Sequence, residues 1–169
     1  KDELKNLHFV ENVGRTVSEF IQHGLVQKLE GDIDWCILTC DQAAFDILGF
    51  EVKDYLDISG ITDRQRFVNE TGWELSKSLK TVDWSNSFIG VLKDFHLGNI
   101  KEVDKGNTIF EVQIDESVVE WMGRNILVKV SGDQYEARDA IRKFYMDKGL
   151  YDERLNINTL EECMMLNFA

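Results

Sequence analysis

The sequence predicts an α+β protein in which helices pack against an antiparallel sheet. From Asn6 to His96, apolar residues recur mainly at the spacing of amphipathic helices. After that point short stretches alternate apolar and polar residues, as half-buried strands do, and the turn Asp104-Lys105-Gly106-Asn107 separates two of them. We therefore expect one domain over residues 1–169, with a helical N-terminal part (1–60) and a ligand-binding core (61–169).

Composition and charge indicate a folded protein and argue against several classes of function. Of the 169 residues, 43% are hydrophobic and 30% are charged, and the formal net charge is −12. No apolar run approaches the ~18 residues of a membrane helix, and Lys and Arg do not cluster as nucleic-acid binding requires. Three cysteines without framework spacing fit a reducing compartment. We expect a cytoplasmic protein that contacts neither membranes nor nucleic acid directly.

The N-terminal part is predicted to hold two helices. The first covers Asn6–Leu29, where valines and other apolar residues follow helical spacing, and the second covers Asp32–Leu48 and ends before Gly49. The stretch WCILTC (35–40) could also be a short strand, because Trp, Ile and Thr favour strands. We favour the helix.

The next helix is predicted over Arg64–Leu79, opened by a capping box from Thr62 to Gln65. It contains Gly72, and a glycine inside a helix costs about 1 kcal/mol relative to alanine. Gly72 falls on the apolar stripe, which indicates that a backbone or a ligand approaches closely there. Trp73 lies on a flank, where it can line a cavity or pack into the core.

The remaining elements follow from the same patterns. A Ser131–Gln134 capping box precedes a helix with Ala137, Ile141, Phe144 and Tyr145 on one face, which stops at Gly149. The other expected elements are a helix over Asp83–His96 and strands over Asn99–Val103, Thr108–Ile114, Asn125–Val130 and Arg154–Phe168.

Catalytic and metal-binding signals are weak in this sequence. Neither a nucleophile elbow nor a phosphate loop nor a dinucleotide fingerprint is present, so we assign no catalytic residue and no cofactor, although an enzyme is not excluded. Cys36 and Cys40 would share a helix face, but a structural zinc site needs four ligands, and core filling is the simpler interpretation. His23 and His96 fit helix C-termini. We assign no metal ligand.

Aromatic residues suggest an apolar pocket. Most of them fit a core rich in rings, but some could instead line a cavity between helices and sheet that admits a small hydrophobic molecule. The candidate ligand-binding residues are Gly72, Trp73, Phe88, Phe95 and Phe110.

Part of the sequence resembles a known family. RQRFVNETGWELSKSL, FIGVLKDF and above all HLGNIKEV (96–103) resemble the 4-vinyl-reductase-like domains, over about Arg64 to Ala169. The resemblance implies a small-molecule sensing module that forms homodimers through helices. Members of the family also bind zinc through several cysteines and a glutamate, for which only Glu161 or Glu162 with Cys163 could correspond. A second, shorter similarity links CILTCDQAAFDILGF to the start of PAS sensor domains.

These observations predict a dimeric, cytoplasmic sensory or regulatory domain with a small hydrophobic ligand. The alternatives are a protein-interaction or scaffold domain without a small ligand, and a PAS-like sensor. An enzyme, such as a reductase of tetrapyrrole side chains, rests on the name of the resembled family alone.

Overall fold

The computed structural model describes residues 2–17, 25–28, 33–56, 65–79, 87–95, 108–150 and 156–159. Within these ranges the predicted α+β class is confirmed, because strands and helices alternate around one sheet. The elements are η1 (Leu4–Asn6), β1 (Val10–Thr16), β2 (Leu25–Lys28), β3 (Asp34–Cys40), α1 (Gln42–Leu48), β4 (Val52–Tyr55), β5 (Gln65–Asn69), α2 (Glu70–Ser78), β6 (Gly90–Leu92), β7 (Thr108–Ile114), α3 (Glu116–Met122), β8 (Asn125–Val130) and α4 (Gln134–Asp147).

The eight described strands form one mixed sheet. Its order is β4-β6-β5-β7-β3-β1-β8, and β2 adds to the same side of β3 as β1 does. The pairs β3/β7 and β5/β6 run parallel, and the other pairs are antiparallel. The sheet is therefore not wholly antiparallel as predicted, because parallel partners need long crossovers that no local turn signal announces.

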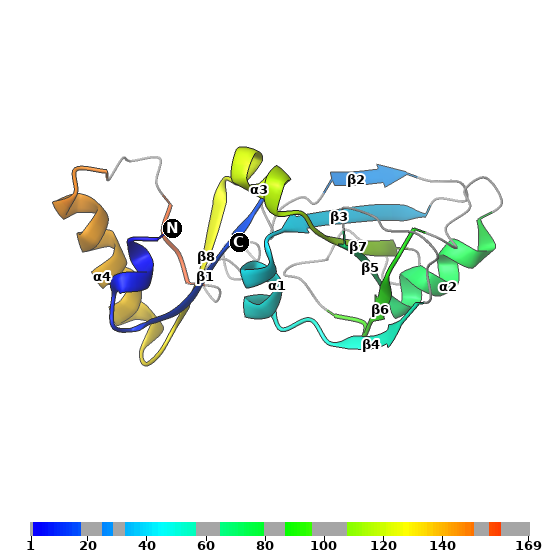
Figure 1. Cartoon of the computed structure of the whole chain (residues 1–169), viewed down its shortest axis with the longest axis horizontal. Helices are drawn as coiled ribbons and strands as arrows, with labels where there is room; N and C mark the ends of the chain where they lie inside the picture. The colour runs from blue at the N-terminus through cyan, green and yellow to red at the C-terminus, as the bar shows by residue number, and fades with distance from the viewer. Residues whose placement is uncertain are drawn as a thin grey trace, which may run out of the picture.

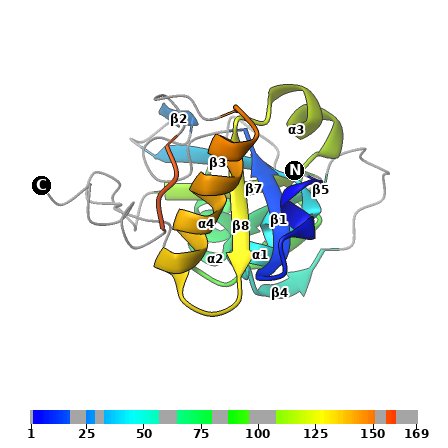
Figure 2. The same cartoon turned by 90° about the vertical axis from the view of Figure 1, so that its left-hand side faces the viewer.

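The elements gather into two lobes. The sheet lobe contains β2 to β7 with α1 and α2, and the ribbon lobe contains η1, β1, β8 and α4. Figure 1 shows α4 and α2 at opposite ends of the molecule, with the β1–β8 ribbon between them. β1 pairs with β3 only through Thr16 and Cys40, but with β8 along its length. Figure 2 shows α4 lying across this ribbon.

Three apolar clusters form the cores of the two lobes. One face of the sheet packs against α1 through Phe67, Leu92, Val112 and Ile114, and the opposite face packs against α2 through Val68, Val91 and Ile109. Adjacent residues of one strand belong to different clusters, as the alternation of side chains along a strand requires. In the ribbon lobe Leu4, Val13 and Ile141 form a third cluster.

The junction between the lobes lies where β1 crosses α1. A Cβ on Gly14 would clash with the backbone of Ala44 and would lie 2.6 Å from its Cβ, so β1 can pass only with glycine here. Asp41 caps α1 by accepting the Ala44 N–H at 2.8 Å, and the same Oδ1 accepts the Arg15 N–H at 3.0 Å. One buried carboxylate therefore ties the start of α1 to β1.

The prediction of a helical N-terminal part is wrong. Within Asn6–Leu29 the described residues form β1 and β2, and the expected helix Asp32–Leu48 divides into strand β3 and the shorter helix α1. WCILTC is a strand, which is the alternative that its strand-favouring residues supported. The helical spacing misled because β3 is covered on both faces, so apolar residues occur at consecutive positions.

The helix predicted over Arg64–Leu79 is half strand. β5 ends at Asn69, which caps α2, so Gly72 stands in the first turn and not in mid-helix. Thr62 of the predicted capping box lies outside the described residues. The helix over Asp83–His96 is also wrong in its described part, where 90–92 forms strand β6; residues 83–86 and 96 are outside the described ranges.

The later elements agree better with prediction. β7, β8 and α4 are confirmed, with Ala137 and Ile141 buried and Gly149 in the left-handed conformation after the helix. Asp133, not Ser131, caps α4. α3 was not predicted. Residues 156–159 are not a strand, and the rest of the predicted last strand, the strand 99–103 and the turn 104–107 lie outside the described residues. The division at residue 60 stays a prediction.

Candidate functional site

A polar joint connects the start of α2 to three strands. Asn69, which is buried, accepts the N–H groups of Gly72 at 3.1 Å and Phe110 at 2.9 Å through its Oδ1. Its Nδ2 donates to Asp94 at 2.8 Å. The side chain thus caps α2, reaches β7 and holds the residues after β6, which satisfies donors that would otherwise be lost at the helix start.

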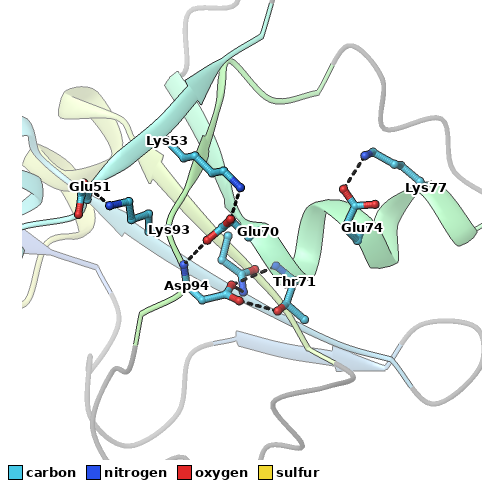
Figure 3. Close-up of polar contacts among 9 residues, drawn as sticks. Glu51, Lys53, Glu70, Thr71, Glu74, Lys77, Lys93 and Asp94 are labelled. Atoms are coloured by element: carbon cyan, nitrogen blue, oxygen red, sulfur yellow. Dashed lines mark hydrogen bonds and ion pairs between the residues drawn. The ribbon is translucent and has the colours of Figure 1, made fainter.

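Asp94 completes this joint from the other side (Figure 3). It accepts the Thr71 N–H at 3.0 Å and the Thr71 hydroxyl at 2.6 Å. Glu70 in turn accepts the Asp94 N–H at 3.3 Å and forms an ion pair with Lys53 of β4. We call Lys53, Asn69, Glu70, Thr71 and Asp94 the α2 joint.

A shallow depression opens beside the α2 joint. It measures about 510 Å³ and is lined by Glu70, Thr71, Glu74, Leu75, Ser78 and Asp94. Each of its carboxylates has a partner, because Glu70 pairs with Lys53, Glu74 with Lys77 at 2.6 Å, and Asp94 accepts the bonds described above. In the described part of the chain, no three His, Cys, Asp or Glu residues are grouped as metal ligands.

Both members of the Lys53–Glu70 pair keep their charges at neutral pH. The hydrogen bond from Lys53 lowers the pKa of Glu70, helped by the Asp94 N–H, and the same bond raises the pKa of Lys53. Neither group is suited to exchange a proton near pH 7. At this depression, the ion pair between Lys53 and Glu70 links β4 to α2, and the bond from the Asp94 N–H to Glu70 links the end of β6 to α2.

A second polar cluster is buried in the sheet lobe. Glu111 on β7 is 1% exposed and accepts two bonds from Arg66 on β5, at 2.5 and 2.9 Å. The Trp35 indole donates to it at 3.0 Å and the Gln113 amide at 2.6 Å. The carboxylate is thus fully satisfied from β3, β5 and β7, which fixes the lateral placement of these strands.

The predicted ligand-binding residues lie on two faces of the sheet. Trp73 packs edge-on against the fully buried Phe88, with ring centroids 6.3 Å apart, in the cluster under α2. Phe95 and Phe110 meet at 5.8 Å on the α1 side. Gly72 faces β7, where a Cβ would lie 3.0 Å from the Ile109 Cα. The structure therefore joins the five residues into two packed groups, and the depression has other lining residues.

The close approach predicted at Gly72 is confirmed, because a Cβ there would clash with the Asn69 Oδ1 and would lie 3.0 Å from the Ile109 Cα. The two described cysteines are buried, as core filling predicted, but they stand on a strand and not on a helix. Four residues along a strand span about 13 Å, so Cys36 and Cys40 cannot share a metal. Burial raises the pKa of the Cys36 thiol to about 11 and that of Cys40 to about 12. Cys163, His23 and His96 lie outside the described residues.

Sequence reasoning missed the Asn69 cap and the exposed Trp121. Asn69-Glu70-Thr71 precedes an apolar stripe and could have been taken as a helix start, but the strand before it was masked by its helix-like spacing. Trp121 is 86% exposed at the end of α3, and no sequence pattern distinguishes such a tryptophan from a buried one.

Comparison with known proteins gives similarity at the level of structure alone. No protein-family model matches the sequence, and no curated protein matches it. The periplasmic region of MacB from Actinobacillus actinomycetemcomitans has 10% sequence identity and a TM-score of 0.54, over 99% of this chain and 80% of that one. The extracellular domain of the noncanonical ABC-type transporter YknZ from Gram-positive bacteria has 15% identity and a TM-score of 0.50, over 88% and 81%.

These similarities correct the family and function predicted from the sequence. The assignment to 4-vinyl-reductase-like domains is wrong, because the structural similarity is to an extracellular domain and a periplasmic region of transporter proteins. For the same reason the predictions of a cytoplasmic location, of a sensory function, of a small hydrophobic molecule as partner and of no contact with a membrane are wrong. The homodimer stays a prediction. None of the described helices has the length and apolar character needed to cross a bilayer.

Proposed function

We propose that this chain is an extracytoplasmic domain of a membrane protein of the ABC-transporter type. The observation that carries the proposal is the structural similarity to MacB and YknZ, which extends over 99% and 88% of the chain. A match of this extent includes both the sheet lobe and the ribbon lobe, and is not confined to a sheet motif that unrelated proteins share.

The site geometry supports a domain that works through shape and contact. In the depression, Glu70 and Asp94 hold β4, β6 and α2 together, and the candidate pocket aromatics pack against one another. These side chains thus stabilise the fold. In a transporter, such a domain would contribute a rigid surface outside the membrane.

Labelling with a membrane-impermeant reagent tests the proposal, because it shows on which side of the membrane the domain lies. In the full-length gene product, Met146→Cys introduces a thiol at a position on α4 that is 54% exposed. Cys163→Ser removes the one thiol of these 169 residues that lies outside the described ranges, and any cysteine elsewhere in the full-length protein is also replaced by serine. The buried Cys36 and Cys40 react slowly because little thiolate forms. A membrane-impermeant maleimide should then label intact cells as fully as lysed cells.

The same cysteine-replaced background without Met146→Cys serves as the matched control and should remain unlabelled in both samples. Labelling of Met146→Cys that appears only after lysis would place the domain in the cytoplasm and refute the proposal. Recovery of the protein in the soluble fraction, away from membranes, would refute it as well.

A further inference from the structure

The sheet lobe and the ribbon lobe share only a short stretch of strand pairing. β1 pairs with β3 through Thr16 and Cys40, whereas it pairs with β8 from Val10 to Thr16. The two lobes also have separate apolar clusters. Hinge bending between two parts of a protein is absorbed at narrow connections of this kind. The bonds around Thr16 therefore decide whether the lobes move relative to each other.

Backbone hydrogen bonds hold the end of β1 on both sides of Thr16. The Val17 N–H donates to the Thr39 carbonyl at 3.0 Å, and the Asp41 N–H donates to the Arg15 carbonyl at 3.1 Å. Thr16, between them, is 0% exposed. Because water does not reach Thr16, bending β1 at this point would leave polar backbone groups unpaired, which is unfavourable.

Asp41 adds a side-chain link at the same point. It is 1% exposed, and its Oδ1 accepts the Arg15 N–H of β1 at 3.0 Å and the Ala44 N–H of α1 at 2.8 Å. Gly14 lies so close to α1 that a Cβ there would clash with the backbone of Ala44. Rotation of β1 away from α1 would therefore take one donor from a buried carboxylate, and buried acceptors lose most when a donor is removed.

The second strand of the ribbon is held at the same helix. Leu127 on β8 packs against the apolar cluster that contains Ala44 and Phe45 of α1. The Arg124 N–H, just before β8, donates to the Thr16 carbonyl at 3.2 Å. Both strands of the ribbon thus rest against α1, β1 through its backbone and β8 through an apolar side chain. Two strands held against one helix resist rotation about the axis of either strand.

We propose that Asp41 locks the contact between β1 and α1, so that the sheet lobe and the ribbon lobe turn as one rigid body and do not hinge at Thr16. α2 and α4, which Figure 1 shows at opposite ends of the molecule, then keep a fixed separation. A partner that contacts both lobes meets them at one spacing. The inference does not depend on the compartment of the protein, so it can fail while the proposed function stands, and the reverse.

Pulsed electron paramagnetic resonance measures the separation of the lobes. Spin labels are attached to Ser78→Cys at the end of α2 and to Met146→Cys on α4, both exposed positions, in the cysteine-replaced background of the full-length protein. The reference pair is Ser78→Cys with Glu51→Cys, which is exposed next to β4 on the same lobe. Labelled protein is diluted with unlabelled protein, so that only distances within one molecule are measured.

We expect the distribution of distances between the lobes to be as narrow as that of the reference pair. A distribution about twice as wide, or one with two separate maxima, would reveal a hinge and overturn the proposal.

Two substitutions test the role of Asp41. Asp41→Ala removes the shared oxygen and should widen the distribution between the lobes about twofold without changing the reference pair. Asp41→Asn keeps an oxygen that accepts both N–H groups and should leave both distributions as in the parent. Asp46→Ala removes an exposed carboxylate from the same helix and is the matched control, which should also change neither.

Two results would overturn the assignment of the lock to Asp41. One is an Asp41→Ala variant whose distribution between the lobes is as narrow as in the parent. The other is a variant that widens both distributions equally, because this would mean that Asp41 holds the sheet lobe itself together.

Discussion

At the scale of single residues, Gly72 and Asn69 decide how α2 meets the sheet. Asn69 places its Oδ1 between the N–H groups of Gly72 and Phe110, and Gly72 leaves room for that oxygen and for the Ile109 backbone. A side chain at position 72 would therefore disturb the cap and the packing together. The general helix propensity of the residue matters less here than the space around it.

Gly72→Ala should destabilise the protein by about 1–3 kcal/mol, because its Cβ would clash with the Asn69 Oδ1 that caps α2 and would lie 3.0 Å from the Ile109 Cα on β7. This outcome opposes the gain of about 1 kcal/mol that alanine gives inside a free helix. Urea unfolding measures the difference. The control is Ser78→Ala, which also introduces alanine but at the exposed last residue of α2. It should be neutral or slightly stabilising. A stabilised Gly72→Ala variant would show that β7 yields easily at this point.

The buried thiols should make stability depend on alkaline pH. Unfolding exposes Cys36 and Cys40, whose pKa values fall from about 11 and about 12 to near the ordinary 9.0. Below pH 9 both states keep the protons and nothing changes. Above pH 9 the unfolded state loses them first, so the free energy of unfolding falls by up to about 1.4 kcal/mol per thiol and pH unit.

Unfolding in urea at pH 9, 10 and 11 would measure this dependence against a Cys36→Ala/Cys40→Ala variant. Lysines and tyrosines titrate in both proteins, so the thiols account for the difference between the two slopes. Parallel slopes would contradict the assignment of raised pKa values to these groups.

At the scale of elements, Asp94 fastens the end of β6 onto the first turn of α2. In Asp94 one carboxylate oxygen accepts the Thr71 hydroxyl, and the other accepts the Thr71 N–H and the Asn69 amide. Asp94→Asn replaces one of these oxygens by an NH₂ group, which cannot accept the bonds made there. We expect a loss of about 1–3 kcal/mol, because these donors lose their acceptor. Thermal unfolding measures the change.

Glu74→Gln is the matched control for that variant. It removes an exposed pair with Lys77 from the same helix, and such a pair is worth at most about 0.5 kcal/mol. A loss as large as that of Asp94→Asn would indicate that general electrostatics, and not the specific bonds of Asp94, hold α2 in place.

The elements also show which sequence signals were reliable. α4 was predicted because it has one buried and one exposed face, which gives the period of 3.6 residues its clear form. β7 is covered on both faces, but the polar Glu111 and Gln113 alternate with apolar residues and so kept the period of 2 visible in the sequence. β3, β5 and β6 were missed because both faces of the sheet are covered around them. At the α2 joint, Asn69 and Asp94 are separated by 25 positions in the chain, and a single sequence gives no indication that they meet.

At the scale of the whole molecule, the two lobes depend on the passage of β1 over α1. Gly14→Ala should cost about 3 kcal/mol or more, because the new Cβ clashes with the backbone of Ala44. Hydrogen exchange of the β1 and β8 amides, together with the unfolding free energy, would report the loosened junction. Adding Ala44→Gly should not restore stability, since it removes only the 2.6 Å side-chain contact; full recovery would contradict this account.

The order of the strands in the sheet could not be predicted from the sequence. The α+β class followed from local patterns, but the order of strands depends on contacts between distant segments, and the resemblance to a sensor family directed attention to an internal pocket. The exposure of Trp121 could not be predicted either, because the local sequence gives the residue type and not its environment.

The pairing of β1 with β8 has a consequence for how the chain is made. Val10 and Val130 are partners, so β1 is synthesised first and has no partner in the ribbon until β8 has emerged. Contacts of such long range slow folding and leave an unpaired strand exposed meanwhile. We expect the sheet lobe to form early and the ribbon lobe to close last, which makes β1 the strand of this domain that stays unpaired longest during synthesis.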